Sequence, residues 1–194
     1  MTKILFICLG NICRSPAAEG VMRQMVEQAG RTDDFYIDSA GIGNWHAGEL
    51  PDRRMRRRGA LRGYDFSSRA RQFTPADFGR FDLICVMDRG NLHDIVKQQR
   101  CPNDAKKVVM LTDFLQRYRG TAEIPDPYYG DDADFDWALD LIEDACAQLL
   151  RNLTSEQPHT ALLFPTPLLL SLLFHYAKIS YPPCRLCQRR GYES

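Results

Sequence analysis

The chain has 194 residues, which is enough for one domain with a substantial core, or for one domain and an extension. Its 25 lysines and arginines balance 25 aspartates and glutamates, and this neutrality argues against a general nucleic-acid binder. The seven irregularly spaced cysteines do not resemble a disulfide framework, and the first residues do not resemble a secretory signal, so we expect a cytoplasmic protein.

Apolar runs typical of buried strands alternate with segments of helical periodicity. The strand-like runs are Ile4–Cys8, Phe35–Ser39, Leu83–Met87 and Val108–Leu111, and the helix-like stretches are Pro16–Ala29, Asp52–Leu61, Asn91–Gln99 and Phe135–Leu153. Core faces are predicted for the first and last helices, at Ala18, Val21, Met22, Met25, Val26 and at Trp137, Leu141, Ala145, Leu149. The alternation predicts an α/β fold: a central parallel four-stranded sheet with helices on both faces.

Residues 8–15, Cys-Leu-Gly-Asn-Ile-Cys-Arg-Ser, follow the first strand and precede a helix with Pro16 in its first turn. Backbone N–H groups of such a loop converge on an anion, helped by the positive end of the helix. The same groups stabilise a thiolate, so we expect Cys8 to be ionised and nucleophilic. Arg14 adds a planar fork that matches two phosphate oxygens. The segment therefore predicts a phosphate-binding loop whose thiolate attacks a bound phosphoryl group.

Asp126, between Pro125 and Pro127, is the candidate general acid and base. Attack by a thiolate leaves a phosphocysteine, so the reaction needs a proton donor for the departing oxygen and then a base for water. One carboxyl group can serve both steps in succession, and the flanking prolines would stiffen its loop. Without the Cys8 loop, the same residues would be interpreted as a surface turn.

The sequence resembles the low-molecular-weight protein tyrosine phosphatases over its first 153 residues. The residues that carry the resemblance are Cys8–Pro16, Ser39-Ala40-Gly41, Trp45-His46, Pro51-Asp52, Ala70-Arg71-Gln72, Met87-Asp88, Asn91-Leu92 and Asp126-Pro127-Tyr128. The resemblance implies a phosphoric monoester hydrolase that dephosphorylates tyrosine-phosphorylated proteins and small aryl phosphates through a phosphocysteine. It implies no cofactor and no metal, and we expect a monomer.

The resemblance also implies roles for individual residues. Ser15 resembles the hydroxyl that lowers the charge on the departing Cys8, and Asn11 and Ser39 resemble the polar network that supports the loop. The implied catalytic residues are Cys8, Arg14 and Asp126, and the implied substrate-binding residues are Leu9, Gly10, Asn11, Ile12, Cys13, Ser15, Trp45, Tyr128 and Tyr129. Trp45 could instead pack in the core, and Ser39 could be an ordinary polar strand end. Ser68 stands where the family commonly has a histidine, which weakens the carry-over of its network there.

Cys13 is five residues after Cys8 on the same loop, so the two sulfurs could approach bonding distance. A disulfide between them would protect an oxidised Cys8 from further oxidation. The alternative is a thiol that only packs the loop.

Six arginines crowd the segment 52–62, namely Arg53, Arg54, Arg56, Arg57, Arg58 and Arg62. We expect a solvated helix face. The alternative is that some of these arginines steer anionic substrates toward the cleft.

We expect residues 154–194 to form a flexible extension of unknown function, because the run Thr154–Pro158 resembles a linker. The apolar stretch Ala161–Phe174 is broken by prolines and is too short for an ordinary transmembrane helix, although membrane contact stays open. Cys184 and Cys187 form only half a zinc site, and His159 and His175 are poorly spaced to complete it.

Two other functions compete with a phosphatase. An arsenate reductase on the same fold would need further cysteines as an electron relay, and Cys85 in a strand and Cys101 before a proline are not a convincing pair. A non-catalytic phosphotyrosine-binding or redox-sensing module would predict a damaged nucleophile or acid, and neither is damaged in this sequence.

Overall fold

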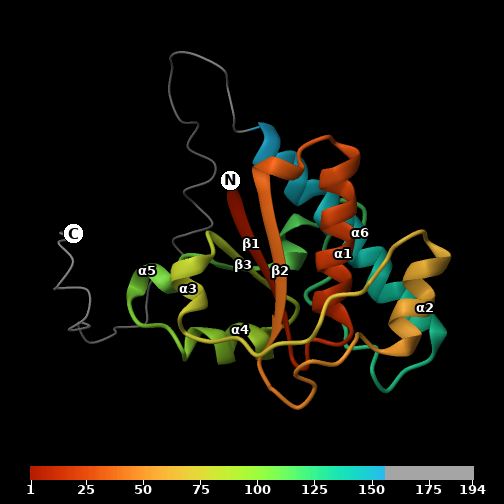
Figure 1. The fold of residues 1–194 in the computed structure, drawn as a ribbon, viewed down its shortest axis with the longest axis horizontal. Helices are drawn as coiled ribbons and strands as arrows, with labels where there is room; N and C mark the ends of the chain where they lie inside the picture. The colour runs from red at the N-terminus through yellow and green to blue at the C-terminus, as the bar shows by residue number, and fades with distance from the viewer. Residues whose placement is uncertain (156–194) are drawn as a thin grey trace.

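The structure is a computed structural model that describes residues 1–155 (Figure 1). Its elements are β1 (Thr2–Cys8), α1 (Arg14–Gln28), the 3-10 helix η1 (Thr32–Asp34), β2 (Phe35–Gly41), α2 (Arg53–Leu61), α3 (Asp77–Arg80), β3 (Leu83–Val86), α4 (Arg89–Val96), α5 (Pro102–Ala105), β4 (Val108–Met110), the 3-10 helix η2 (Leu111–Phe114) and α6 (Asp132–Ser155). The strands form one sheet in the order β2-β1-β3-β4, and all neighbours are parallel. The predicted α/β fold is confirmed.

The central strand β1 contributes side chains to two hydrophobic cores on opposite faces of the sheet, because successive side chains of a strand point to opposite sides. Ile4 and Phe6 belong to the core that includes α1 and α6. Leu5 and Ile7 belong to the core on the side of α3 and α4. Figure 1 shows these helices on the two sides of the strands. This double burial explains why the strand is a continuous apolar run.

The sheet order reverses direction at β1, since β2 lies on one side of it and β3 with β4 on the other. In open parallel sheets, ligands bind at such a switch point, outside the carboxyl ends of the strands. The register pairs Cys8 at the end of β1 with Gly41 of β2, and Ile7 with Val86 of β3. The loop after Cys8 therefore lies where the topology favours a binding site.

All four predicted strands and all four predicted helices are present, with shifted ends. Helix α1 begins at Arg14, two residues before the predicted start. Helix α4 is Arg89–Val96 and not Asn91–Gln99, because the Asp88 carboxylate caps it by accepting a hydrogen bond from the Asn91 N–H (2.6 Å). The short helices α3, α5, η1 and η2 were not predicted, since so few residues show no helical period.

The predicted core faces hold, with one correction in α6. The α1 positions are buried apart from Met25, which is half-buried, and Leu141, Ala145 and Leu149 of α6 are also buried. Trp137 was expected in the same stripe, but it is 38% exposed. Its indole ring meets the Tyr118 ring edge-on, with 4.9 Å between centroids, so it packs at the margin of the core.

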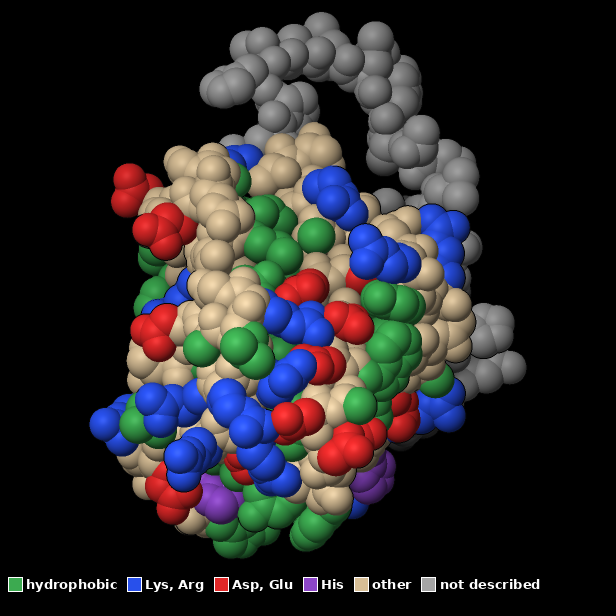
Figure 2. Space-filling model, turned by 90° about the vertical axis from the view of Figure 1, so that its right-hand side faces the viewer, with side chains coloured by type: hydrophobic (Ala, Val, Ile, Leu, Met, Phe, Trp, Pro, Cys, Tyr) green, Lys and Arg blue, Asp and Glu red, His purple; other side chains and the backbone are tan. Residues whose placement is uncertain are grey.

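The arginines of α2 differ from the expected solvated face, because three of them form ion pairs with α6. Figure 2 shows basic and acidic side chains interleaved on this side of the molecule. We call these pairs the charge ladder: Arg57 with Asp132, Arg58 with Asp136, and Arg62 with Asp136, Asp140 and Glu143. The ladder joins two helices that are far apart in the sequence, and this long-range pairing was not predicted.

The predictions made for the tail lie outside the described residues; they concern Pro158, Ala161–Phe174, Cys184, Cys187, His159 and His175. Within residues 1–155, no helix is long and apolar enough to cross a bilayer. The same residues contain no cluster of three histidine, cysteine or acidic side chains that could hold a metal ion.

Candidate active site

The loop between β1 and α1 folds around the buried thiol of Cys8. The Cys8 Sγ lies 3.0 Å from the Ser15 Oγ in the first turn of α1. Asn11 has a φ of 56°, the left-handed conformation that a loop with inward-pointing N–H groups requires. Among residues 1–155 it is the only non-glycine residue with a positive φ. The loop thus turns back and brings the Cys8 sulfur to the amino-terminal end of α1.

Arg14 is the most constrained side chain of the site, with only 2% of its surface exposed. One guanidinium nitrogen, Nη1, donates to the Asp88 carboxylate (2.6 Å) and to the Ile124 carbonyl (3.0 Å). The other, Nη2, donates to the Asp126 carboxylate (2.7 Å). Its Nε has no hydrogen-bond partner within the described part of the chain.

The structure therefore brings together the three residues predicted to be catalytic. Cys8 and Arg14 belong to one loop. Asp126 lies more than 100 residues further along the chain, and its ion pair with Arg14 holds it beside that loop. Burial would lower the pKa of Arg14, but the facing groups Cys8 and Asp126 and the hydrogen bond to Asp88 outweigh it and raise that pKa. The guanidinium therefore stays charged between the two carboxylates.

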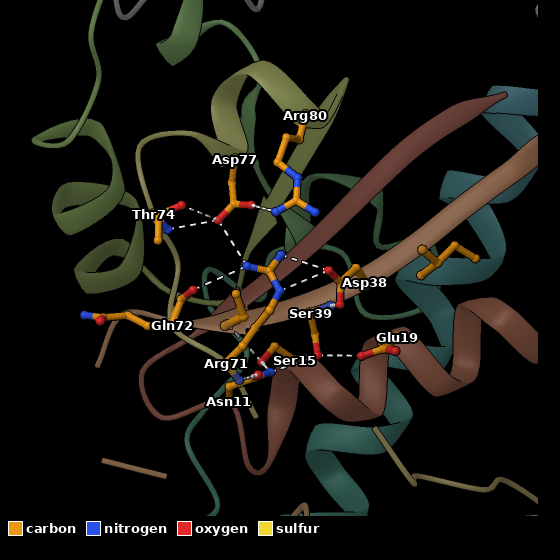
Figure 3. Close-up of polar contacts among 12 residues, drawn as sticks. Asn11, Ser15, Glu19, Asp38, Ser39, Arg71, Gln72, Thr74, Asp77 and Arg80 are labelled. Atoms are coloured by element: carbon orange, nitrogen blue, oxygen red, sulfur yellow. Dashed lines mark hydrogen bonds and ion pairs between the residues drawn. The ribbon is translucent and has the colours of Figure 1, made fainter. Parts of the chain in front are cut away.

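The side chain of Asn11 connects the loop to three other segments (Figure 3). Its amide nitrogen donates to the hydroxyls of Ser15 (2.9 Å) and Ser39 (2.8 Å). Its amide oxygen accepts from the backbone N–H of Arg71 (2.9 Å). Ser39 is 2% exposed and bonded within the site, so the alternative of an ordinary polar strand end does not describe it.

Figure 3 shows Arg71 between two carboxylates, and it forms an ion pair with each of them. Its guanidinium donates to Asp38 on β2 (2.9 and 3.0 Å) and to Asp77 at the start of α3 (3.1 Å). Because the Arg71 backbone N–H holds Asn11, this clamp fixes the support of the loop to the sheet.

Behind Ser39 lies a buried carboxyl group, Glu19 of α1, which is 2% exposed. The Ser39 hydroxyl donates to Glu19 (2.5 Å), and Arg23 pairs with it (2.8 Å). Burial raises the pKa of Glu19, while hydrogen bonds from Ser39 and Ser68 and the charge of Arg23 oppose that rise.

Close packing beneath the loop explains the glycine at the end of β2. A side chain on Gly41 would come within 3.0 Å of the Gly10 and Asn11 backbone. Above the loop, the His46 ring would lie 3.2 Å from a Cβ on Gly10, so this histidine covers the loop from outside. His46 also pairs with Glu49 (2.8 Å).

The residues predicted to wall the cleft include several exposed apolar side chains. The exposed fractions are 45% for Leu9, 67% for Trp45, 37% for Tyr128 and 97% for Tyr129, while Ile12 is buried. The exposure of Trp45 rules out the alternative of core packing. The Tyr128 and Tyr129 rings meet edge-on at 5.0 Å. Such surfaces suit a flat aromatic group.

Cys13 is buried and lies directly before α1. Burial and the neighbouring groups Cys8, Asp52 and Asp126 raise the pKa of the Cys13 thiol, so this side chain is protonated at neutral pH.

Sequence reasoning missed several groups that complete the site. Asp88 and Arg71 lie in the motifs that carried the family resemblance, but no role was given to them, because only the fold brings them to Arg14 and Asn11. Glu19 and His46 were missed as well. Glu19 had a detectable signal, a carboxyl group within the apolar face of a predicted helix.

Comparisons with known proteins identify the family to which the chain is similar. A family profile described as low molecular weight phosphotyrosine protein phosphatase matches residues 3–159. A Synechocystis sp. protein named as belonging to the low molecular weight protein-tyrosine-phosphatases is 48% identical over 154 residues, which are 79% of this chain and 98% of that protein. The low molecular weight phosphotyrosine protein phosphatase of Sus scrofa is 40% identical over 136 residues, 69% of this chain and 84% of the relative.

Among solved structures, the chain is similar to a protein tyrosine phosphatase from Entamoeba histolytica. That crystal structure contains Hepes in the active site, and it superposes with a TM-score of 0.77 at 39% identity, covering 80% of this chain and 98% of the other.

We predict that Asn11→Gly will weaken both the loop and the fold. Glycine keeps the positive φ but removes three hydrogen bonds, and unsatisfied buried partners cost about 1–3 kcal/mol. Urea unfolding should show that loss, and the inhibition constant for inorganic phosphate should rise. Asn44→Gly, at an exposed position, is the matched control. Equal behaviour of the two variants would contradict the assigned support role of Asn11.

Proposed function

The chain belongs to the low molecular weight phosphotyrosine protein phosphatase family, and we propose that it hydrolyses phosphotyrosine in proteins, and small aryl phosphates, through a phosphocysteine intermediate. The observation that carries the proposal is the ion pair between Arg14 and Asp126, because it sets a general acid beside the Cys8 loop. The family's members are hydrolases. For this chain, we propose the phosphocysteine intermediate and the roles of Cys8, Arg14 and Asp126.

In the first step, the Cys8 thiolate attacks phosphorus while the loop N–H groups and Arg14 hold the other phosphate oxygens. The S–P bond forms and the bond from phosphorus to the phenolic oxygen breaks. Asp126 gives its proton to that oxygen, so the product leaves as a neutral phenol. Its carboxyl group, with 39% of the side chain exposed, can reach the leaving group from the mouth of the cleft.

In the second step, the Asp126 carboxylate takes a proton from water as the water attacks the phosphocysteine. The S–P bond breaks, inorganic phosphate is released, and Cys8 departs as a thiolate. The Ser15 hydroxyl, 3.0 Å from the sulfur, would stabilise this departing charge. Asp126 ends protonated and ready for the next cycle.

The rim of the site supports aromatic substrates. Leu9, Trp45, Tyr128 and Tyr129 present exposed apolar surface around the loop opening, and a phenyl ring can pack against them. Gly10, Asn11, Ile12, Cys13 and Ser15 would contact or shape the phosphate cradle. We propose tyrosine-phosphorylated proteins as partners, a monomeric enzyme and a cytoplasmic location, where a thiolate stays reduced.

The arsenate reductase alternative is less well supported. Its relay would use Cys85 and Cys101, but Cys85 is fully buried in β3, and burial holds the pKa of its thiol well above its usual value. Cys101 is half-buried and precedes α5. The positioned acid Asp126 also has no purpose in that reaction. A disulfide between Cys8 and Cys13, formed under oxidation, is compatible with the phosphatase and stays a proposal.

Cys8→Ser tests the mechanism directly. A serine hydroxyl is a far weaker nucleophile at neutral pH, so hydrolysis of an aryl phosphate should be abolished. Binding of inorganic phosphate, measured by calorimetry, should persist because Arg14 and the loop amides remain. Appreciable turnover by this variant would overturn the thiolate mechanism. It would also exclude a non-catalytic binding module, because the protein would still be an enzyme.

Asp126→Asn tests the proton donor. We expect kcat/KM to fall by roughly 10²–10⁴ for phenyl phosphate, the range for losing a general acid. The loss should be much smaller for 2,4-dinitrophenyl phosphate, whose leaving group departs without a proton. Glu123→Gln, which removes an exposed carboxylate three residues away, is the control and should resemble the unmodified enzyme. An equal loss for both substrates would make Asp126 structural.

We also propose that residues 1–153 form the phosphatase domain and residues 154–194 an extension outside it. All residues assigned to the chemistry lie before residue 131, and the last described helix, α6, ends at Ser155. A chain ending at Ser155 should be soluble and should keep near-normal kcat on phenyl phosphate. Unfolding of this shortened chain in circular dichroism, or loss of its activity, would show that the boundary is wrong.

A further inference from the structure

Arg54 differs from the other arginines of α2 in what it contacts. The charge-ladder arginines Arg57, Arg58 and Arg62 bond to side chains of α6. Arg54 instead reaches the segment 124–130, which we call the acid loop because it contains Asp126. The role of Arg54 inferred from these contacts rests on the proposed phosphatase activity.

The guanidinium of Arg54 holds the acid loop by its backbone. Nη2 donates to the Tyr128 carbonyl (2.9 Å), and Nη1 lies 3.5 Å from the Gly130 carbonyl. The guanidinium also stands over two rings, at 5.6 Å from the Tyr128 centroid and 4.7 Å from that of Phe135. Three of these contacts hold the acid loop at Tyr128 and Gly130, and the fourth, with Phe135, ties the guanidinium to α6.

The same guanidinium is held on its other side by Asp52, the N-cap of α2. Nη2 and Nε donate to the two Asp52 oxygens (2.8 and 3.1 Å), and the Arg54 backbone N–H donates as well (2.7 Å). These hydrogen bonds lower the pKa of Asp52, so the pair stays charged. The Asp52 N–H donates to the Ile12 carbonyl in the phosphate loop (2.7 Å). Asp52 and Arg54 thus link the two loops of the site.

Tyr128 transmits this link to the acid. Its N–H faces the Asp126 carboxylate (3.2 Å), while its carbonyl accepts from Arg54. The peptide groups around Tyr128 are consequently held between the acid and the arginine. We propose that Arg54 is a positioning residue for proton transfer, which sets Asp126 at the leaving oxygen by holding Tyr128 against the phosphate loop.

The variant Arg54→Gln tests this role, with Arg58→Gln as the matched control. Both variants remove an arginine of the same helix that is bonded to a carboxylate, but only Arg54 contacts the acid loop. Arg54→Gln should lower kcat/KM for phenyl phosphate by up to about 10²-fold, the scale of a catalytic group misplaced by about 1 Å. It should leave kcat/KM for 2,4-dinitrophenyl phosphate and the inhibition constant for inorganic phosphate nearly unchanged. Arg58→Gln should show no such dependence on the leaving group.

A second measurement separates positioning from stability. In the Asp126→Asn background, Arg54→Gln should add little further loss, because the group that it positions is already absent. Arg54→Lys should recover part of the activity on phenyl phosphate, since an ammonium can still reach the Tyr128 carbonyl. Equal losses for both substrates, additive losses in the double variant, or an Arg58→Gln variant that behaves like Arg54→Gln would overturn the proposal.

Failure of the proposed function would be distinct from failure of this inference. It would appear as an unmodified protein without aryl phosphatase activity, or as an active Cys8→Ser variant, and it would overturn both. Failure of the Arg54 role alone would give an enzyme that still depends on Cys8 and Asp126. In that enzyme, Arg54→Gln would affect phenyl phosphate and 2,4-dinitrophenyl phosphate equally.

Discussion

A buried cation at the end of the central strand is the constraint around which the site is arranged. An arginine with almost no exposed surface is costly unless charged and polar partners replace its water. Arg14 finds these partners in Asp88, Asp126 and the Ile124 carbonyl, which come from two distant segments. Because the cation must be compensated, the carboxyl ends of the sheet and the acid loop are drawn to the phosphate loop.

A second polar network keeps that loop in a conformation that the backbone would not adopt freely. The left-handed Asn11 is held by its amide, and the amide is held in turn by Ser39 and by the Arg71 backbone. Arg71 is paired with Asp38 and Asp77, so the network that supports the loop extends from Asn11 to β2 and α3. Preorganisation of this kind lowers the reorganisation that an anion would otherwise demand on binding.

The fold and the centre of the site could be predicted because their signals are local. Apolar runs marked β1 and β3, and Cys8, Arg14 and Asp126 stand in short motifs. What could not be predicted depends on packing between distant segments. The pairing of Arg58 with Asp136, the exposure of Trp137 and the part of Arg71 all require the helices and strands to be placed first. The start of α4 was misjudged for a local reason, since Asp88 was not recognised as its N-cap.

The charge ladder has a consequence for how this sequence can change. Six arginines lie between residues 53 and 62, in α2 and at its C-cap, and three of them pair with carboxylates that α6 presents in a matching register. A substitution on one helix that reverses a charge creates a like-charge contact across the interface, and only a reciprocal reversal on the other restores the attraction. Residues 57–62 and 132–143 are therefore coupled: we expect a single charge reversal on either segment to weaken the contact more than a reciprocal pair of reversals does.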